Sequence, residues 1–252
     1  MRNAPQKVTF SIDLFYRGVS TREIQNHLQS FFPHNSSHMT IYRWIVKYAK
    51  VISRFTDNLK LKVGKELQID EMEIGSRKSR YNGWFIDCID TETRFLVSSA
   101  FKKNRSLKEV KYVLAKAKQK TENQFEVITS DGWLAYPQAI QKTFVLKEKS
   151  ITRRYGVEHN ILNISKNDDL FNYKIERLHN SIRHRIKTFR GLHSVKPSNE
   201  LMKGYVIYYN FIRKHQAIRK CPYEIATNLK LNSENKWLQL IKLAKDFKDD
   251  NN

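Results

Sequence analysis

The chain has 252 residues, 40% of them hydrophobic, which is enough to bury a substantial core in one or two domains. Lysine and arginine total 46 against 25 acidic residues, so the formal net charge is +21 and the pI is near 9.9. This excess favours a polyanionic partner, either nucleic acid or an anionic membrane, over a merely soluble basic protein. The sequence has neither an apolar run of transmembrane length nor a signal-peptide pattern, and its two cysteines favour a reducing compartment.

The first 60 residues predict a set of short helices. Residues 8–17 have a helical pattern that Gly18 ends, and the segment from Ser20 to Glu23 has the form of a capping box that begins a second helix. After a polar turn at 33–38, a third helix begins near Met39, and its apolar positions are Ile41, Trp44, Ile45 and Tyr48. Its polar side carries Thr40, Tyr42, Arg43 and Lys47. This arrangement is typical of a helix-turn-helix that binds DNA, although an ordinary three-helix cap has the same pattern.

Between residues 64 and 192, strand and helix patterns alternate. Strands are expected at 66–74, 83–90, 93–101 and 125–130, with a weaker one at 159–164. Helices are expected at 106–121, for a short length from Trp133, and at 171–189. The predicted order of elements is three strands, a helix, a strand, a helix, a strand and a helix, which is the order of a ribonuclease H-like fold. This assignment rests partly on the known topology of that fold. We therefore predict an α/β fold with a mixed sheet.

The remainder of the chain, residues 193–252, has a helical pattern. Pro197 is expected to open a helix, Pro222 to interrupt the segment after it, and residues 234–249 to form an amphipathic helix. The sequence thus divides into three predicted parts, which are a helix-turn-helix domain over residues 1–60, a catalytic core over 61–195 and a helical C-terminal extension over 196–252.

Three acidic residues occupy positions that can converge in such a fold. Asp70 lies within the first strand pattern, Asp131 directly follows the fourth, and Glu176 lies early in the helix at 171–189. Three carboxylates on a basic protein suit divalent metal ions that act on nucleic-acid phosphates, because two Mg²⁺ ions about 3.5–4 Å apart neutralise the phosphate and orient the nucleophile. Asp70 suits a position that bridges the two ions, and Asp131 and Glu176 suit the flanks.

Each acid also has a simpler interpretation. Asp70 is followed by Glu71 and Glu73, either of which could be the ligand, but Glu71 is expected on the opposite face of the strand and so does not easily share a site with Asp70. Asp131 begins an Asp-Gly pair that is common in turns, and Glu176 could pair with a neighbouring arginine. The sequence contains no Walker-type glycine loop, no Gly-x-Ser-x-Gly elbow and no His-Glu-x-x-His segment.

The helix at 171–189 lies in the most basic part of the chain, since residues 172–220 contain twelve lysines and arginines but two glutamates. Spacings of 3, 4, 4 and 3 place one stripe on a single face, which consists of Glu176, His179, Arg183, Lys187 and Arg190. The apolar stripe one position earlier is the expected core face. We expect the first stripe to be exposed and to hold DNA phosphates near the metal site, although a solvated basic face is the alternative. His179 could orient a metal ligand, contact a phosphate or be an ordinary surface residue of the helix.

These segments together resemble DDE-class insertion-sequence transposases, and in particular the insertion sequence 6 family and its archaeal relatives. The similarity spans roughly residues 20–226 and lies in ordered segments, which are Thr40–Trp44, Ile69–Glu71 with Trp84 and Asp90, Thr129–Tyr136, Asn172–His179 with Arg183, Lys187, Arg190 and Gly191, Tyr209–His215 and Pro222–Ala226. The interval before the third acid is longer than the family usually shows. It contains Asp168 and Asp169, which remain alternatives to Glu176.

The resemblance implies a ribonuclease H-like catalytic core, Mg²⁺ or Mn²⁺ as cofactor, with two ions, and recognition of terminal inverted repeats. It assigns the catalytic and metal-binding roles to Asp70, Asp131 and Glu176. It also implies DNA as the partner, at both element ends and target, and a homo-oligomer that is at least a dimer on DNA, in the cytoplasm and nucleoid of a prokaryote. The alternatives are a related nuclease or polynucleotidyl transferase, and a catalytically silent DNA-binding regulator derived from a transposase.

Overall fold

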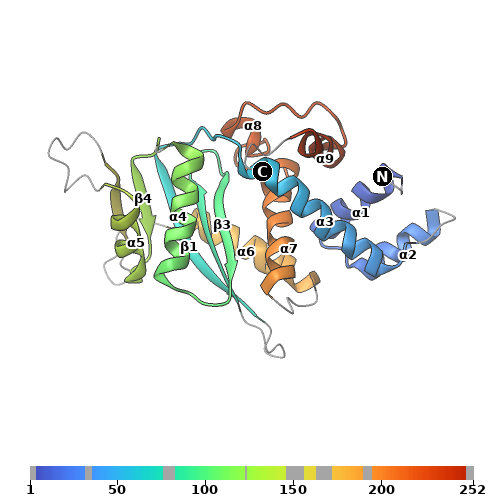
Figure 1. Cartoon of the computed structure of the whole chain (residues 1–252), viewed down its shortest axis with the longest axis horizontal. Coiled ribbons are helices and arrows are strands. Elements are labelled where there is room, and N and C mark those ends of the chain that lie inside the picture. The colour runs from blue at the N-terminus through green and yellow to red at the C-terminus, as the bar shows by residue number, and fades with distance from the viewer. Residues whose placement is uncertain are drawn as a thin grey trace.

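The computed structural model describes residues 4–31, 36–75, 83–122, 124–145, 156–162, 172–189 and 195–247. It places a mixed sheet and its covering helices at one end of the molecule and the N-terminal helices at the other (Figure 1). A helix near the C-terminus, α7 (Val195–Ile207), lies between them and contacts both α3 (His38–Asp57) and β3 (Leu96–Lys102). Within the described ranges, no helix combines the length and the apolar character needed to cross a bilayer.

The central strand of the sheet is β1 (Glu66–Ile74), and the strand order is β3-β2-β1-β4-β5. β2 (Gly83–Asp90) pairs antiparallel with β1 and with β3, whereas β4 (Val127–Ser130) and β5 (Glu158–Ile161) continue the sheet in parallel pairing. The mixed sheet and this order confirm the predicted α/β fold. The third strand begins three residues later than predicted, because residues 91–93 form the turn that follows β2.

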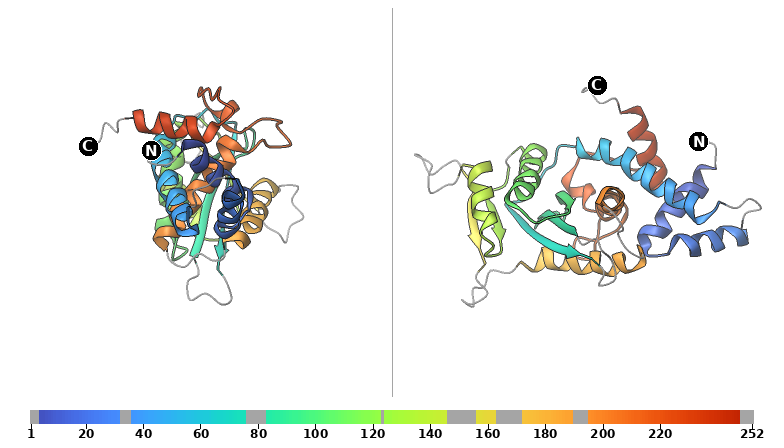
Figure 2. Two further views of the ribbon diagram at one scale, coloured as in Figure 1. Left: turned by 90° about the vertical axis from the view of Figure 1, so that its right-hand side faces the viewer. Right: turned by 60° about the horizontal axis from the view of Figure 1, so that its bottom comes forward.

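The register of the sheet decides which side chains face which helix. Directly paired residues on neighbouring strands share a face, and Cys88 pairs with Ser98. The Ser98 hydroxyl donates a 2.9 Å hydrogen bond to the Val113 carbonyl oxygen of α4 (Leu107–Thr121), so this face lies against α4. The alternate pair, Asp70 and Asp87, therefore points to the opposite face, where α6 (Tyr173–Ile186) contacts β1 and β2 (Figure 2). α5 (Ala135–Thr143) packs beside α4.

The predicted signals at the N-terminal helices are confirmed in detail. α1 (Pro5–Arg17) ends at Gly18, whose φ of 107° lies in the left-handed region that glycine favours. Before α2 (Thr21–Phe31), the Ser20 N–H donates to Glu23 Oε2 at 2.9 Å and the Glu23 N–H donates to Ser20 Oγ at 3.3 Å, which is a reciprocal capping box. In α3 the four predicted apolar positions are all buried, namely Ile41, Trp44, Ile45 and Tyr48.

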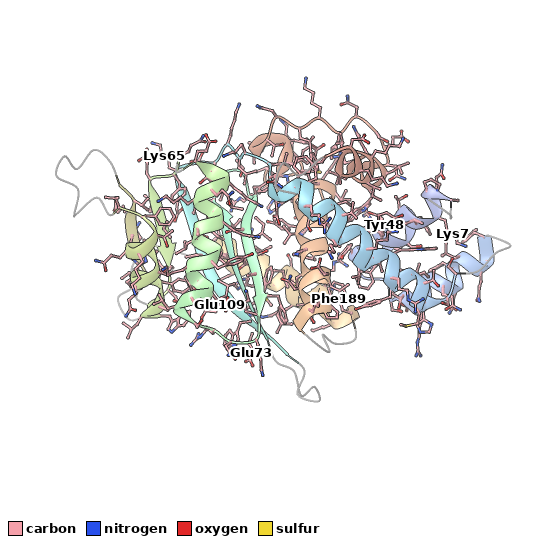
Figure 3. The ribbon with its side chains drawn as sticks, viewed as in Figure 1. Lys7, Tyr48, Lys65, Glu73, Glu109 and Phe189 are labelled. Atoms are coloured by element: carbon pink, nitrogen blue, oxygen red, sulfur yellow. The ribbon has the colours of Figure 1, made fainter. Side chains whose placement is uncertain are left out.

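The C-terminal elements pack on the N-terminal helices. α7 begins at Val195, two residues before the predicted Pro197, and continues into a π-helical turn at Tyr208–Ile212. After α8 (Tyr223–Ala226), α9 (Lys236–Asp246) contacts α1 and α3. Figure 3 shows Lys7 and Tyr48 among the N-terminal helices, and Lys65 and Glu73 at opposite ends of β1. The division into three domains at residues 60 and 195 stays a prediction.

Tyr16 is the residue around which α1 meets the C-terminal elements. Its side chain is fully buried, and its ring stacks on Tyr208 and Trp237 at centroid distances of 6.3 and 5.7 Å. Its hydroxyl donates to the Leu201 carbonyl oxygen at 3.2 Å. Gly204 permits this approach, because a Cβ at that position would lie 1.8 Å from the Tyr16 hydroxyl oxygen.

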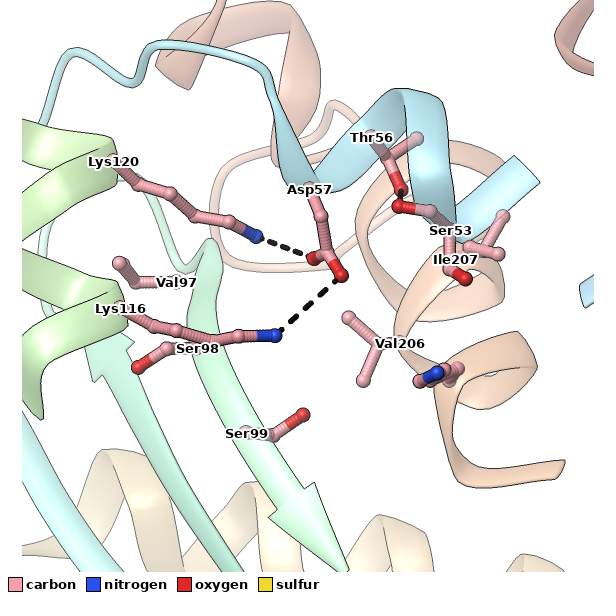
Figure 4. A pocket seen from close by; sticks show the side chains of 11 residues that line it. Ser53, Thr56, Asp57, Val97, Ser98, Ser99, Lys116, Lys120, Val206 and Ile207 are labelled. Atoms are coloured by element: carbon pink, nitrogen blue, oxygen red, sulfur yellow. Dashed lines mark hydrogen bonds and ion pairs between the residues drawn. The ribbon is translucent and has the colours of Figure 1, made fainter. Parts of the chain in front are cut away.

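A charged junction connects the end of α3 to α4. Asp57 pairs with Lys120 at 2.8 Å and with Lys116 at 3.7 Å, beside a cavity of about 40 Å³ (Figure 4). Burial acts to raise the pKa of Asp57, but the two ammonium groups outweigh it, so the pKa lies below its ordinary value. Because the Asp57 side chain is 41% exposed, each pair stabilises the junction by at most about 1 kcal/mol.

Candidate active site

Two of the three predicted acids meet where β4 ends beside β1. Asp70 lies in the middle of β1, and Asp131 directly follows Ser130, the last residue of β4. The parallel pairing of the two strands ends at Gln68 and Thr129, two residues before Asp70 and Asp131 respectively. Asp70, Glu71 and Asp131 each place one carboxylate oxygen within 4.8 Å of the others.

The environment of Asp70 is unfavourable for a bare negative charge. Burial, with the nearby charges of Asp87 and Glu71, raises the pKa of Asp70 to about 7. His179 and a 2.8 Å hydrogen bond from the Glu71 N–H act in the opposite direction without reversing the shift. A carboxyl group in such surroundings is stabilised in its charged form by a cation placed next to it.

Asp131 is held by its own turn. Its Oδ1 accepts a 2.9 Å hydrogen bond from the Trp133 N–H, which fixes the side chain relative to the end of β4. The simpler interpretation of Asp131 as a turn residue is therefore correct in part, but the same turn directs a carboxylate toward Asp70. Asp131 therefore both stabilises the turn after β4 and belongs to the acidic cluster.

The expectation that Glu71 does not share a site with Asp70 is wrong. The Glu71 side chain is 3% exposed, and its carboxylate pairs with Arg105 Nη1 at 2.5 Å and accepts a hydrogen bond from the Tyr136 hydroxyl. Among the described residues, β1 pairs with β4 only as far as Gln68, so the side chains of consecutive residues can meet around this part of the strand. The exposed neighbour Glu73 is not a member of the cluster.

Arg105 is itself held between two aromatic rings. Its guanidinium lies 4.8 Å from the ring centroid of Trp84 and 4.4 Å from that of Trp133. Cation–π contacts of this kind fix the direction of a guanidinium as well as stabilising it. Glu71 therefore has a positively charged partner of its own, whereas Asp70 and Asp131 have none as close in the cluster that the structure describes.

The third predicted acid, Glu176, lies on α6 and outside the 4.8 Å cluster. It is exposed, in the first turns of the helix. The Gln68 side chain of β1 accepts a 3.3 Å hydrogen bond from the Ile175 N–H, and His179 contacts Asp70 one turn further on. Contacts to the sheet face that carries Asp70 therefore lie just before Glu176, at Ile175, and just after it, at His179.

The predicted exposed stripe on α6 needs one correction. His179 is 2% exposed, with Nε2 at 2.7 Å from Asp87 Oδ1 and Nδ1 at 3.5 Å from Asp70 Oδ2, so it is not on the exposed face. Burial acts to lower the pKa of His179, but Asp87 and Asp70 outweigh it and raise that pKa overall. Arg183 and Lys187 are exposed as predicted. Arg190 and the alternatives Asp168 and Asp169 lie outside the described residues.

The donor set fits a hard divalent cation. Mg²⁺ and Mn²⁺ prefer oxygen ligands, and the cluster offers carboxylate oxygens alone. Burial raises the pKa of Asp70, and the charges of Asp87 and Glu71 add to the shift, so a cation bound beside this carboxyl group would favour its charged form. Asp70, Glu71 and Asp131 are the described residues that could hold an ion together, and Glu176 lies outside this cluster on α6.

The third N-terminal helix presents a basic face. Arg43 and Lys47 are exposed, and Thr40 and Tyr42 are partly exposed, on the side away from the buried apolar positions. The same face continues with exposed Lys50 and Arg54, which sequence reasoning missed although their spacing of 3 and 4 residues extends the pattern. The chain between α2 and α3 includes residues 32–35, which lie outside the described ranges, so the helix-turn-helix assignment stays a prediction.

Comparison with known proteins gives one family match. The family model described as a DDE domain matches residues 66–216, which is more than half of the chain. The search of curated proteins found no match to this chain. Among solved structures, the HTLV-2 integrase catalytic core domain in complex with magnesium is similar with a TM-score of 0.44 and 17% identity, over 66% of this chain and 98% of that one. The simian T-cell lymphotropic virus intasome has a TM-score of 0.48 and 14% identity, over 70% of this chain and 60% of that one.

Proposed function

The chain belongs to the family of DDE transposase domains, and on that premise we propose that it is a DNA transposase that binds the terminal inverted repeats of its element and transfers a freed 3′-hydroxyl to target DNA. Its domain is that of a metal-dependent polynucleotidyl transferase with a ribonuclease H-like fold. The observation that carries the proposal is the approach of Asp70 and Asp131 at the end of β4, on a strongly basic chain.

In this proposal three acids have distinct positions. Asp70 is on the central strand and Asp131 directly follows β4. We propose that Glu176, on α6, supplies the third carboxylate. Bound Mg²⁺ or Mn²⁺, for which we propose two ions, supplies charge neutralisation at the scissile phosphate and an activated oxygen nucleophile. Arg183 and Lys187, exposed on the same helix as Glu176, bind the phosphates that flank the scissile one.

The partner in this proposal is DNA, at the element ends and at the target. α3 reads the terminal repeat in the major groove, with Thr40, Tyr42, Arg43 and Lys47 toward the bases and the phosphates beside them. Because two element ends must be joined to one target, we propose that the protein acts as a homo-oligomer, at least a dimer on DNA. In a prokaryote its place of action would be the nucleoid.

A strand-transfer assay tests the proposed function. The protein is incubated with Mg²⁺, a labelled duplex that carries the element's terminal repeat, and a supercoiled target plasmid. We expect 3′-end cleavage and covalent joining of the labelled strand to the plasmid, both abolished by a chelator. Cleavage without joining would identify a nuclease instead, and binding without cleavage would identify a silent regulator.

The exposed basic residues of α6 give a prediction about salt dependence. Arg183→Ala and Lys187→Ala should each weaken binding to every DNA sequence alike, because a phosphate contact carries no sequence information. The slope of log affinity against log salt should become shallower by about one per contact removed. Fluorescence anisotropy at several salt concentrations measures it. The control is Lys108→Ala, because Lys108 is an exposed residue of α4, which covers the other face of the sheet. This variant should leave the slope unchanged.

Arg43 gives a prediction about sequence preference. A bidentate contact from an arginine to guanine discriminates by about 1–3 kcal/mol, so Arg43→Ala should reduce the preference for terminal-repeat DNA over random DNA by that amount. Metal-dependent nicking of non-specific DNA should persist. Arg54→Ala, further along the same exposed face, is the matched control and should change affinity without changing preference. Equal losses of preference in both variants would show that α3 does not read bases from its N-terminal part.

A further inference from the structure

A buried polar pair lies beneath the site and has no part in the chemistry described so far. Asp87, in β2, has a side chain with no solvent exposure, and its Oδ1 lies 2.7 Å from His179 Nε2. The His179 side chain is 3% exposed, and its other ring nitrogen, Nδ1, lies 3.5 Å from Asp70 Oδ2. One imidazole thus connects two carboxylates that face each other across the β1–β2 ladder.

Stability alone is a poor reason for this arrangement. A buried ion pair contributes little net free energy, because the loss of hydration offsets the attraction between the charges, and apolar residues of similar volume would serve packing as well. The second oxygen of Asp87, Oδ2, is buried and has no hydrogen-bond partner among the described residues, which adds a further cost. Because stability does not account for the Asp87–His179 pair, its role must lie in the residues that it holds in position.

It holds two of the proposed ligands at once. His179 Nδ1 lies at an ion-pair distance of 3.5 Å from Asp70 Oδ2, and the ring itself is held by the 2.7 Å hydrogen bond between Nε2 and Asp87 Oδ1. It also attaches α6 to the sheet three residues after Glu176, while the Gln68 side chain attaches α6 at Ile175, just before Glu176. The orientation of Asp70 and the position of the helical turn that carries Glu176 thus depend on one side chain.

We propose that Asp87 and His179 are a pair of positioning residues, in which Asp87 orients the His179 ring so that its Nδ1 holds the Asp70 carboxylate for metal binding. This inference rests on the proposed function, since it concerns the metal site that Asp70 and Glu176 share. A positioning role can be distinguished from a purely structural one by experiment, because substitutions can replace the two ring nitrogens of His179 one at a time.

Two substitutions perform that separation in the full-length protein. His179→Gln places an amide nitrogen where Nε2 was, so it can still donate to Asp87 but has no group for Asp70. His179→Asn places an amide nitrogen where Nδ1 was, so it can still donate to Asp70 but leaves Asp87 unpaired. His184→Gln, at an exposed histidine on the same helix, is the matched control. Mn²⁺ affinity is measured from the electron paramagnetic resonance signal of free Mn²⁺, and folding from thermal melting.

For a positioning pair, His179→Gln should melt close to wild type yet bind Mn²⁺ about tenfold or more weakly, the usual loss when an outer-shell partner of a metal ligand is removed. His179→Asn should melt at a lower temperature but recover part of the Mn²⁺ affinity. If His179→Gln binds Mn²⁺ like wild type and His184→Gln, the pair is structural and the inference is overturned. Because the readout is metal binding, wild type that binds Mn²⁺ but fails to transfer strands would refute the proposed function while the variants still decide the positioning role.

Discussion

Asp70→Asn and Asp131→Asn are each expected to reduce metal-dependent strand cleavage by about 10³-fold or more, while binding to terminal-repeat DNA stays measurable. Each substitution keeps the shape of the side chain and removes the charge that attracts a divalent ion. Glu176→Gln should have the same effect if α6 supplies the third ligand. Cleavage rates on a denaturing gel, with Mg²⁺ and with Mn²⁺, measure the losses.

The control for these three variants is Glu73→Gln, which removes an exposed acid from the same strand as Asp70 and should cleave like wild type. Robust cleavage by Glu176→Gln would remove that residue from the site and make Asp168 and Asp169 the next candidates. Robust cleavage by Asp70→Asn would contradict the whole assignment, because Asp70 is the residue proposed to bridge the ions, and it would make Glu71, the other acid of β1 in the described cluster, the next candidate.

Tyr16→Ala is expected to produce a large loss of stability, about 3–5 kcal/mol in the free energy of unfolding. The residue is fully buried, and its ring stacks on Tyr208 and Trp237, so its removal opens a cavity between α1 and the C-terminal elements. Urea denaturation followed by circular dichroism measures the loss.

Tyr16→Phe is the matched variant, because it keeps the ring and removes only the hydrogen bond to the Leu201 carbonyl oxygen. We expect it to cost about 1 kcal/mol. If Tyr16→Ala proved no more harmful than Tyr16→Phe, the aromatic cluster would not be what joins α1 to the C-terminal part of the chain.

Local signals in the sequence predicted the elements of the fold well. Gly18 ends α1 and the Ser20–Glu23 capping box precedes α2, because both depend on residues close together in the chain. The expected order of strands and helices, with Asp70 within a strand and Asp131 at the end of another, predicted that these two acids could converge, and the structure brings them together. The position of α7 between β3 and α3 could not be predicted, since it depends on packing between segments far apart in sequence.

The errors in the site have physical causes of the same kind. Helical spacing placed His179 with the charged residues of α6, but spacing shows which residues share a face and not whether a polar group on it has a buried partner, here Asp87. Strand alternation assigns Glu71 and Asp70 to opposite faces of β1, but it does not show where the ends of long side chains lie once the pairing with β4 has ended at Gln68. The Arg105 and Tyr136 contacts that hold Glu71 come from distant parts of the chain.

The central claim is that Asp70, Asp131 and Glu176 together hold the divalent ions that act on DNA. Anomalous diffraction from crystals grown with Mn²⁺ and terminal-repeat DNA tests it most directly, because the signal locates the metal without reference to activity. We predict an ion between the carboxylates of Asp70 and Asp131, with the Glu176 carboxylate coordinating an ion on the α6 side. Manganese held by other residues, or a Glu176 carboxylate that coordinates no ion, would contradict the account.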